Sequence, residues 1–140
     1  MTAAPATSPA VDLMAEAIAE ATWARIEHIK PGYRAQRRFP TWSKLDAAER
    51  QSWRLCARHV LTALRQAGEM NDGARRLLIA RTVADATWEA TRTDGRPSLT
   101  PFPTWETVTA DHRGDYMHIA GDIMSRVRAA KAQAQQARAA

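Results

Sequence analysis

The stretch that decides the fold is the tetrapeptide Phe-Pro-Thr-Trp, which occurs at residues 39–42 and again at residues 102–105. Tryptophan is the rarest of the common residues, so we interpret the recurrence, at an offset of 63, as an internal duplication. The same offset aligns further identical residues in the two halves of the chain. These pairs are Gly32 and Gly95, Ala47 and Ala110, Arg50 and Arg113, Ala57 and Ala120, and Arg65 and Arg128.

Upstream of the tetrapeptides the offset becomes 65, where Ala-Thr-Trp at 21–23 matches the same three residues at 86–88. The acidic residues Glu20 and Asp85 are paired by this second offset. A two-residue deletion in the later copy explains the change of offset. We therefore predict two helical repeats, residues 10–67 and 74–130. A flexible N-terminus (1–9) and a frayed helical or disordered tail (131–140) flank them.

Each copy reads as a helix, an irregular loop and a second helix. The first helix is predicted to begin near Ser8-Pro9, since serine caps a helix and proline favours its first position. Lys30-Pro31-Gly32 should stop it. The second helix should begin at the capping box Asp46–Glu49, run to about Gln66 and end at Gly68. In the later copy the helices are predicted over 74–92 and from about 110 onward.

The predicted fold class is therefore all-α: two tandem helix-loop-helix repeats packed as one compact four-helix domain with pseudo-twofold symmetry. One hairpin of about 55 residues is marginally stable alone, whereas two can share a core. We expect the five tryptophans to carry much of that core, because each can bury on the order of 200 Å².

Composition narrows the class of protein. The chain has 140 residues, 45% of them hydrophobic, and a net charge of +5. A single cysteine, Cys56, excludes an internal disulfide framework. There is no apolar run of membrane-spanning length and no signal-peptide pattern at the N-terminus. The expectation is a soluble, cytoplasmic, basic protein that does not bind membranes.

The pattern within each copy resembles the ryanodine-receptor-type (RyR) repeat, which is also a helix, a loop rich in Gly, Tyr, Arg and Pro, and a second helix. The later copy departs from the pattern, because Arg96 stands where Tyr33 provides the aromatic after the glycine. The resemblance implies a helical binding module, and bacterial and phage members of that family are suspected nucleotide or ligand binders. The residues that carry it are Trp23, Gly32, Tyr33, Arg34, Arg38, Pro40, Trp42, Leu45, Glu49, Arg50 and Trp53, and then Trp88, Gly95, Phe102, Trp105, Val108, Arg113 and Tyr116.

Positive charge collects between residues 34 and 65, which hold eight Lys and Arg against two acids. Arginine forks onto phosphate and stacks on bases, and aromatic residues lie nearby, so the block resembles an anion or nucleic-acid surface. A solvated helix face and a surface for an acidic protein partner are the alternatives. The candidate ligand-binding residues are Tyr33, Arg34, Arg37, Arg38, Trp42, Arg50, Arg54 and Trp105.

Catalytic signals are missing from the sequence. It contains no HExxH, CxxC, P-loop or GxGxxG motif. Cys56 occupies an apolar helix position, which favours packing over nucleophilic chemistry. We expect no enzymatic activity, no metal and no cofactor. Four residues that share one predicted helix face could hold a divalent ion, but a polar outer face explains them better: Asp111, Asp115, His118 and Asp122.

Two functions are therefore predicted from different classes. The first is a non-enzymatic module that recognises an anionic ligand, a nucleotide or a nucleic acid, through the Arg-rich loop and a Trp/Tyr platform. The second is a structural or adaptor protein, such as a phage virion component or an inhibitor of a host complex. In that case the loops and the helical tail would make the protein contacts. Oligomeric state is not indicated by the sequence.

Overall fold

The computed structural model describes residues 8–32, 41–93, 105–106 and 108–139, with the side chains of 87–93 left out. Within these residues the chain is helical and has no strand. The elements are α1 (Pro9–Ile29), the short 3-10 turn η1 (Trp42–Lys44), α3 (Ala47–Ala67), α4 (Asp72–Thr93) and α5 (Ala110–Ala139). The predicted all-α class with four helices packed together is thus confirmed.

Local capping explains where the helices begin and end. Ser8 precedes α1, with proline in its first turn. Asp46 caps α3 by accepting a hydrogen bond of 2.8 Å from the backbone N–H of Glu49, as the predicted capping box requires. Gly68 ends α3 at a φ of 73°, a left-handed conformation that glycine adopts without steric cost. Asn71 then starts α4 by accepting from the N–H of Ala74 at 2.8 Å.

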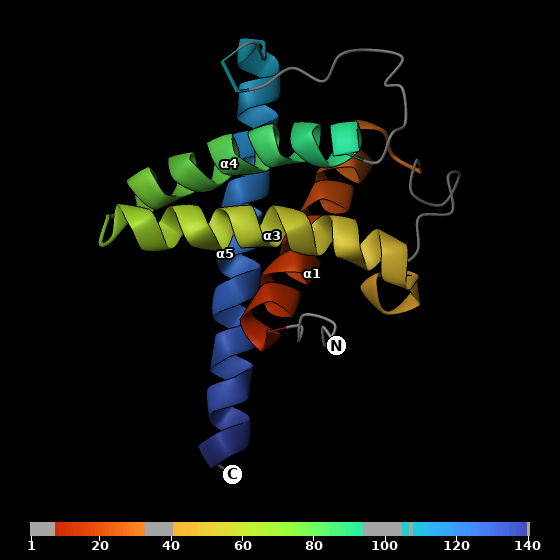
Figure 1. Cartoon of the computed structure of the whole chain (residues 1–140). Helices are drawn as coiled ribbons and strands as arrows, with labels where there is room; N and C mark the ends of the chain where they lie inside the picture. Colours follow the sequence, from red (N-terminus) through yellow and green to blue (C-terminus); the bar gives the residue numbers. More distant parts are fainter. Residues whose placement is uncertain (1–7, 33–40, 94–104, 107, 140) are drawn as a thin grey trace, which may run out of the picture.

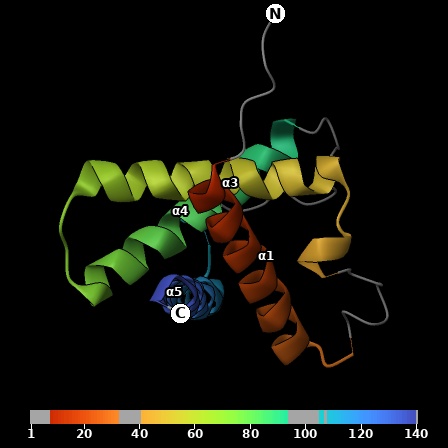
Figure 2. The same cartoon turned by 90° about the horizontal axis from the view of Figure 1, so that it is seen from below.

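The four helices form two crossing layers. α3 and α4 lie side by side as a hairpin, and α1 and α5 cross behind them (Figure 1). Each helix packs against two others, so that contacts run from α1 to α3, α3 to α4, α4 to α5 and α5 back to α1. The view from below shows α5 end-on beside α4 and α1 (Figure 2).

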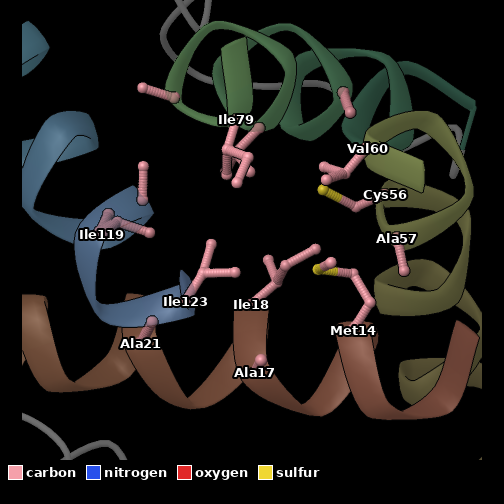
Figure 3. Packing of buried hydrophobic residues seen from close by; sticks show 14 of the residues in the cluster. Met14, Ala17, Ile18, Ala21, Cys56, Ala57, Val60, Ile79, Ile119 and Ile123 are labelled. Atoms are coloured by element: carbon pink, nitrogen blue, oxygen red, sulfur yellow. The ribbon is translucent and has the colours of Figure 1, made fainter. Parts of the chain in front are cut away.

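Small and branched side chains fill the centre of the four helices. Residues of all four helices point into it, among them Met14, Val60, Ile79 and Ile123 (Figure 3). The largest side chains that are completely buried are aliphatic: Ile18, Val60, Val83 and Ile123. Nine of the 21 buried apolar residues among those described are alanines. The middle of the core is therefore built from close helix packing rather than from aromatic bulk.

The described tryptophans take part in two hydrophobic clusters. Trp23 and Trp105 are buried, and Trp42 and Trp53 are half-buried. Trp23 and Trp53 meet edge to face with ring centroids 5.7 Å apart, in a smaller cluster between α1 and α3. The side chain of Trp88 lies outside the described residues. All four described tryptophans thus belong to the core or pack against it, while alanines and branched aliphatic residues fill its completely buried centre.

The tandem duplication and the pseudo-twofold axis stay predictions. The helix order is compatible with them, since α1 and α4 would be equivalent, as would α3 and α5.

The predicted tail is helical. In it α5 continues without a break to Ala139, and residues 131–139 are exposed on every side.

Substitution of Ile18 by alanine is the sharpest test of this core. Ile18 is completely buried between helices, so Ile18→Ala should lower the free energy of unfolding by about 2–5 kcal/mol. Ile29, which is 51% exposed, provides the matched control, and Ile29→Ala should change it by less than about 0.5 kcal/mol. Equal midpoints of urea unfolding for the two variants would contradict the packing described.

Candidate functional site

The loop after α1 holds four of the predicted ligand-binding residues: Tyr33, Arg34, Arg37 and Arg38 lie outside the described residues. The structure does describe both ends of the segment that contains them. At the near end, Gly32 has a φ of 85°, and its backbone N–H donates to the Glu27 carboxylate in the last turns of α1. At the far end, Thr41 leads into the turn η1, where its hydroxyl lies 3.2 Å from that of Ser43.

Trp42 is held from both sides of its peptide. Its backbone N–H donates to Oε1 of Glu20 in α1 at 3.2 Å. The guanidinium of Arg50, in the first turns of α3, donates to the carbonyl oxygens of Trp42 at 3.2 Å and Ser43 at 2.9 Å. The same guanidinium lies 5.5 Å from the centroid of the Trp42 ring. We call this set, Glu20, Trp42 and Arg50, the first clasp.

The later half of the chain contains the same arrangement. The backbone N–H of Trp105 donates to Oδ1 of Asp85 in α4 at 2.9 Å. Arg113, in α5, donates to the carbonyl oxygens of Trp105 at 3.1 Å and Glu106 at 3.4 Å. Its guanidinium lies 5.1 Å from the centroid of the Trp105 ring. This second clasp consists of Asp85, Trp105 and Arg113, the residues that the sequence pairs with those of the first clasp.

The clasps commit three predicted site residues to internal contacts. Trp105 is buried, and Trp42 offers only part of its surface to solvent. Nη2 of Arg50 donates to two backbone carbonyls. Its Nε is buried without a hydrogen-bond partner among the described residues. Sequence reasoning missed this role, although the matching pairs Glu20 with Asp85 and Arg50 with Arg113 were a signal for it.

The four arginines of α3 differ in their contacts: Arg50, Arg54, Arg58 and Arg65. Arg54 donates to Oδ1 of Asp12 at 2.6 Å and ties α3 to α1. Arg58 and Arg65 have no ion-pair partner among the described residues, and Arg65 is exposed. Arg50 and Arg54 therefore make internal contacts in this fold.

The acidic face of α5 is used in ion pairs. Asp115 bonds to Arg25 of α1 at 2.8 Å, and Asp122 bonds to Arg126 one turn along α5 at 3.1 Å. His118 is exposed. The described residues contain no group of three or more His, Cys, Asp or Glu that could hold a metal ion.

Two groups have raised pKa values, both because burial disfavours their charged forms. Burial raises the pKa of the Cys56 thiol to about 12, and the residue is 2% exposed within the core. Burial is also the main cause that raises the pKa of Tyr116, with smaller contributions from Cys56, Asp85 and Asp115. A thiol that stays protonated at neutral pH is a poor nucleophile, so Cys56 packs rather than reacts.

No family model, curated protein or solved structure matches the chain. In the part of the chain that the structure describes, no helix is both long and apolar enough to span a membrane.

Removing either clasp arginine should destabilise the fold. Arg50→Ala and Arg113→Ala each leave two carbonyl oxygens without a charged donor, so each should lower the free energy of unfolding by about 1–3 kcal/mol. At position 113 lysine should restore only part of the loss, because Arg113 reaches its two carbonyls through two different nitrogens, Nε and Nη2, which a single ammonium cannot replace. Thermal or urea unfolding measures the effect. Arg65→Ala is the control, and the clasps play no part in stability if all three alanine variants unfold alike.

The thiol of Cys56 should be protected in the native protein. At pH 8 its reaction with a thiol-specific aromatic disulfide should be much slower in the folded protein than in urea, because the folded thiol is buried and protonated.

The raised pKa of Cys56 also predicts how stability depends on pH. Above pH 9 the unfolded thiol ionises while the folded one does not, so ionisation favours the unfolded state. Between pH 9 and about 12, wild type should therefore lose stability relative to Cys56→Ala. Equal thiol rates in the two states would contradict this assignment.

Proposed function

We propose that this chain is a non-enzymatic binding module for an anionic ligand, a nucleotide or a nucleic acid, and that the loop of residues 33–40 is its contact surface. One observation carries the proposal: a segment with three arginines is anchored at both ends to acidic side chains of α1. Glu27 holds the backbone of Gly32, and Glu20 holds the backbone of Trp42. Anchored ends limit the conformations of a loop and reduce the entropy lost when it binds.

The chemistry of the loop fits a phosphate-bearing ligand. Arg34, Arg37 and Arg38 supply planar guanidinium groups that can bind phosphate oxygens in pairs, and Tyr33 supplies a ring for stacking. The first clasp serves this site indirectly, because it holds the backbone of Trp42, two residues after the loop ends. Arg50 and Arg54 belong to that support.

The two halves of the chain differ at this point. The segment that corresponds to the loop in the later half, residues 94–104, contains one arginine, Arg96, and one acid, Asp94. Both halves have a clasp, but only the earlier half combines it with a cluster of arginines. The proposed site is therefore single and asymmetric, even if the two halves arose by duplication.

A charge-matched pair of variants tests the loop. The variant R34A/R37A/R38A should bind a fluorescent nucleoside triphosphate or single-stranded oligonucleotide at least about tenfold more weakly than wild type, because phosphate contacts dominate such binding. The control R65A/R75A/R81A removes the same charge from two exposed positions, Arg65 on α3 and Arg81 on α4, and from the partly exposed Arg75 on α4. Fluorescence anisotropy at several salt concentrations measures both.

Three results would contradict the proposed site. Wild type would fail to bind any of these probes, the two variants would weaken binding equally, or the affinity would not fall with salt. The last result, together with capture of a protein, would favour the adaptor hypothesis, because a protein interface depends less on salt than phosphate contacts do.

A further inference from the structure

The last part of α5 is a helix with no neighbour among the described residues. α5 runs on past the end of the four-helix body (Figure 1), and every residue from 131 to 139 is exposed. We call residues 131–139 the α5 extension; a nine-residue helix is about 14 Å long. Alanine, glutamine, lysine and arginine all favour helix, and the extension continues a packed helix, so it avoids the cost of nucleation.

Charge on this part of the chain has one sign. Residues 123–140 hold four cationic side chains and no acid. Three basic residues and one glutamine share one face of the helix, because they are three, four and three residues apart. They are Arg128, Lys131, Gln135 and Arg138. Arg128 pairs with Asp72 at 2.8 Å, but both side chains are well exposed, so this pair is weak and can exchange for another anion.

The apolar content of the extension is too small for a hydrophobic interface. Its only apolar side chains are alanines, each with a single methyl group to bury. Burial of a few methyl groups yields less free energy than two associating proteins lose in translational and rotational freedom. A second copy of this chain would also bring like charges together. The extension is therefore suited to a partner that binds by charge and hydrogen bonds.

We propose that the α5 extension binds duplex DNA by lying in the major groove. Small alanine side chains keep the helix narrow enough for a groove that accepts an α-helix, and the basic residues along one side reach phosphates. Glutamine side chains at 133, 135 and 136 can bond to base edges, where glutamine pairs with adenine. This inference shares with the proposed function only the class of ligand, and it uses none of the loop residues.

The experiment compares wild type with R128Q/K131Q/R138Q in the full chain, using a labelled DNA duplex and fluorescence anisotropy over a range of salt. The variant should bind the duplex at least about tenfold more weakly, and its log–log salt slope should be shallower by about 2.7, or 0.9 for each lost phosphate contact. The control R65Q/R75Q/R81Q removes the same charge elsewhere and should bind close to wild type.

A second variant separates a groove-binding helix from a merely charged tail. Ala134→Pro keeps every charge but removes the hydrogen bond to the carbonyl of residue 130 and breaks the helix beyond the packed body. It should also weaken duplex binding, while circular dichroism and the melting temperature should show that the four-helix body stays folded. Duplex binding at wild-type strength by Ala134→Pro would overturn the groove assignment.

Three further outcomes are decisive. Competition by poly-glutamate as strong as that by the duplex, at equal charge, would overturn the proposal in favour of an acidic protein partner. Failure of the loop can be recognised separately: if nucleotides and single strands do not bind but the duplex binds through the extension, the loop site is wrong and the extension stands. If R34A/R37A/R38A loses all binding and R128Q/K131Q/R138Q loses none, the extension is wrong.

Discussion

The bond from a guanidinium to a tryptophan carbonyl is the interaction on which the rest of the structure depends. In both halves an arginine near the start of the second helix reaches back to the tryptophan peptide, while an acid from the first helix holds the N–H of the same residue. The chain between two helices is thereby fixed at the point where it turns. Each clasp thereby adds a polar tie between two helices, α1 and α3 or α4 and α5, that also pack directly against each other.

The clasps also explain why so much positive charge coexists with a compact fold. Arg50 and Arg113 are turned toward backbone oxygens, and Arg25 and Arg54 toward carboxylates on neighbouring helices. These groups neutralise or satisfy one another and do not repel across the surface. Outside this network lie exposed cations such as Arg65 on α3 and Lys131 and Arg138 near the end of α5.

Local signals in the sequence indicate where the helices begin and end, but they do not indicate which contacts Arg50 and Trp42 make. Pro9, Asp46 and Gly68 act on their own neighbours in the chain, so their effect on helix ends is visible in sequence. Arg50 bonds to a carbonyl of Trp42, which lies eight residues earlier in the chain. Whether this bond forms depends on where the turn places Trp42. The helical spacing of the arginines does not reveal that position. The sequence likewise does not show that the described tryptophans share the core with alanines, because burial depends on how the helices cross.

The abundance of alanine in that centre has a thermodynamic consequence. Alanine buries little apolar surface, and the heat capacity of unfolding grows with the apolar surface that becomes hydrated. Nearly half of the buried apolar positions described are alanine, so this chain should have a small heat capacity of unfolding for its length. Its stability would then change gently with temperature along a broad, shallow curve, and denaturant would act on it with a low slope.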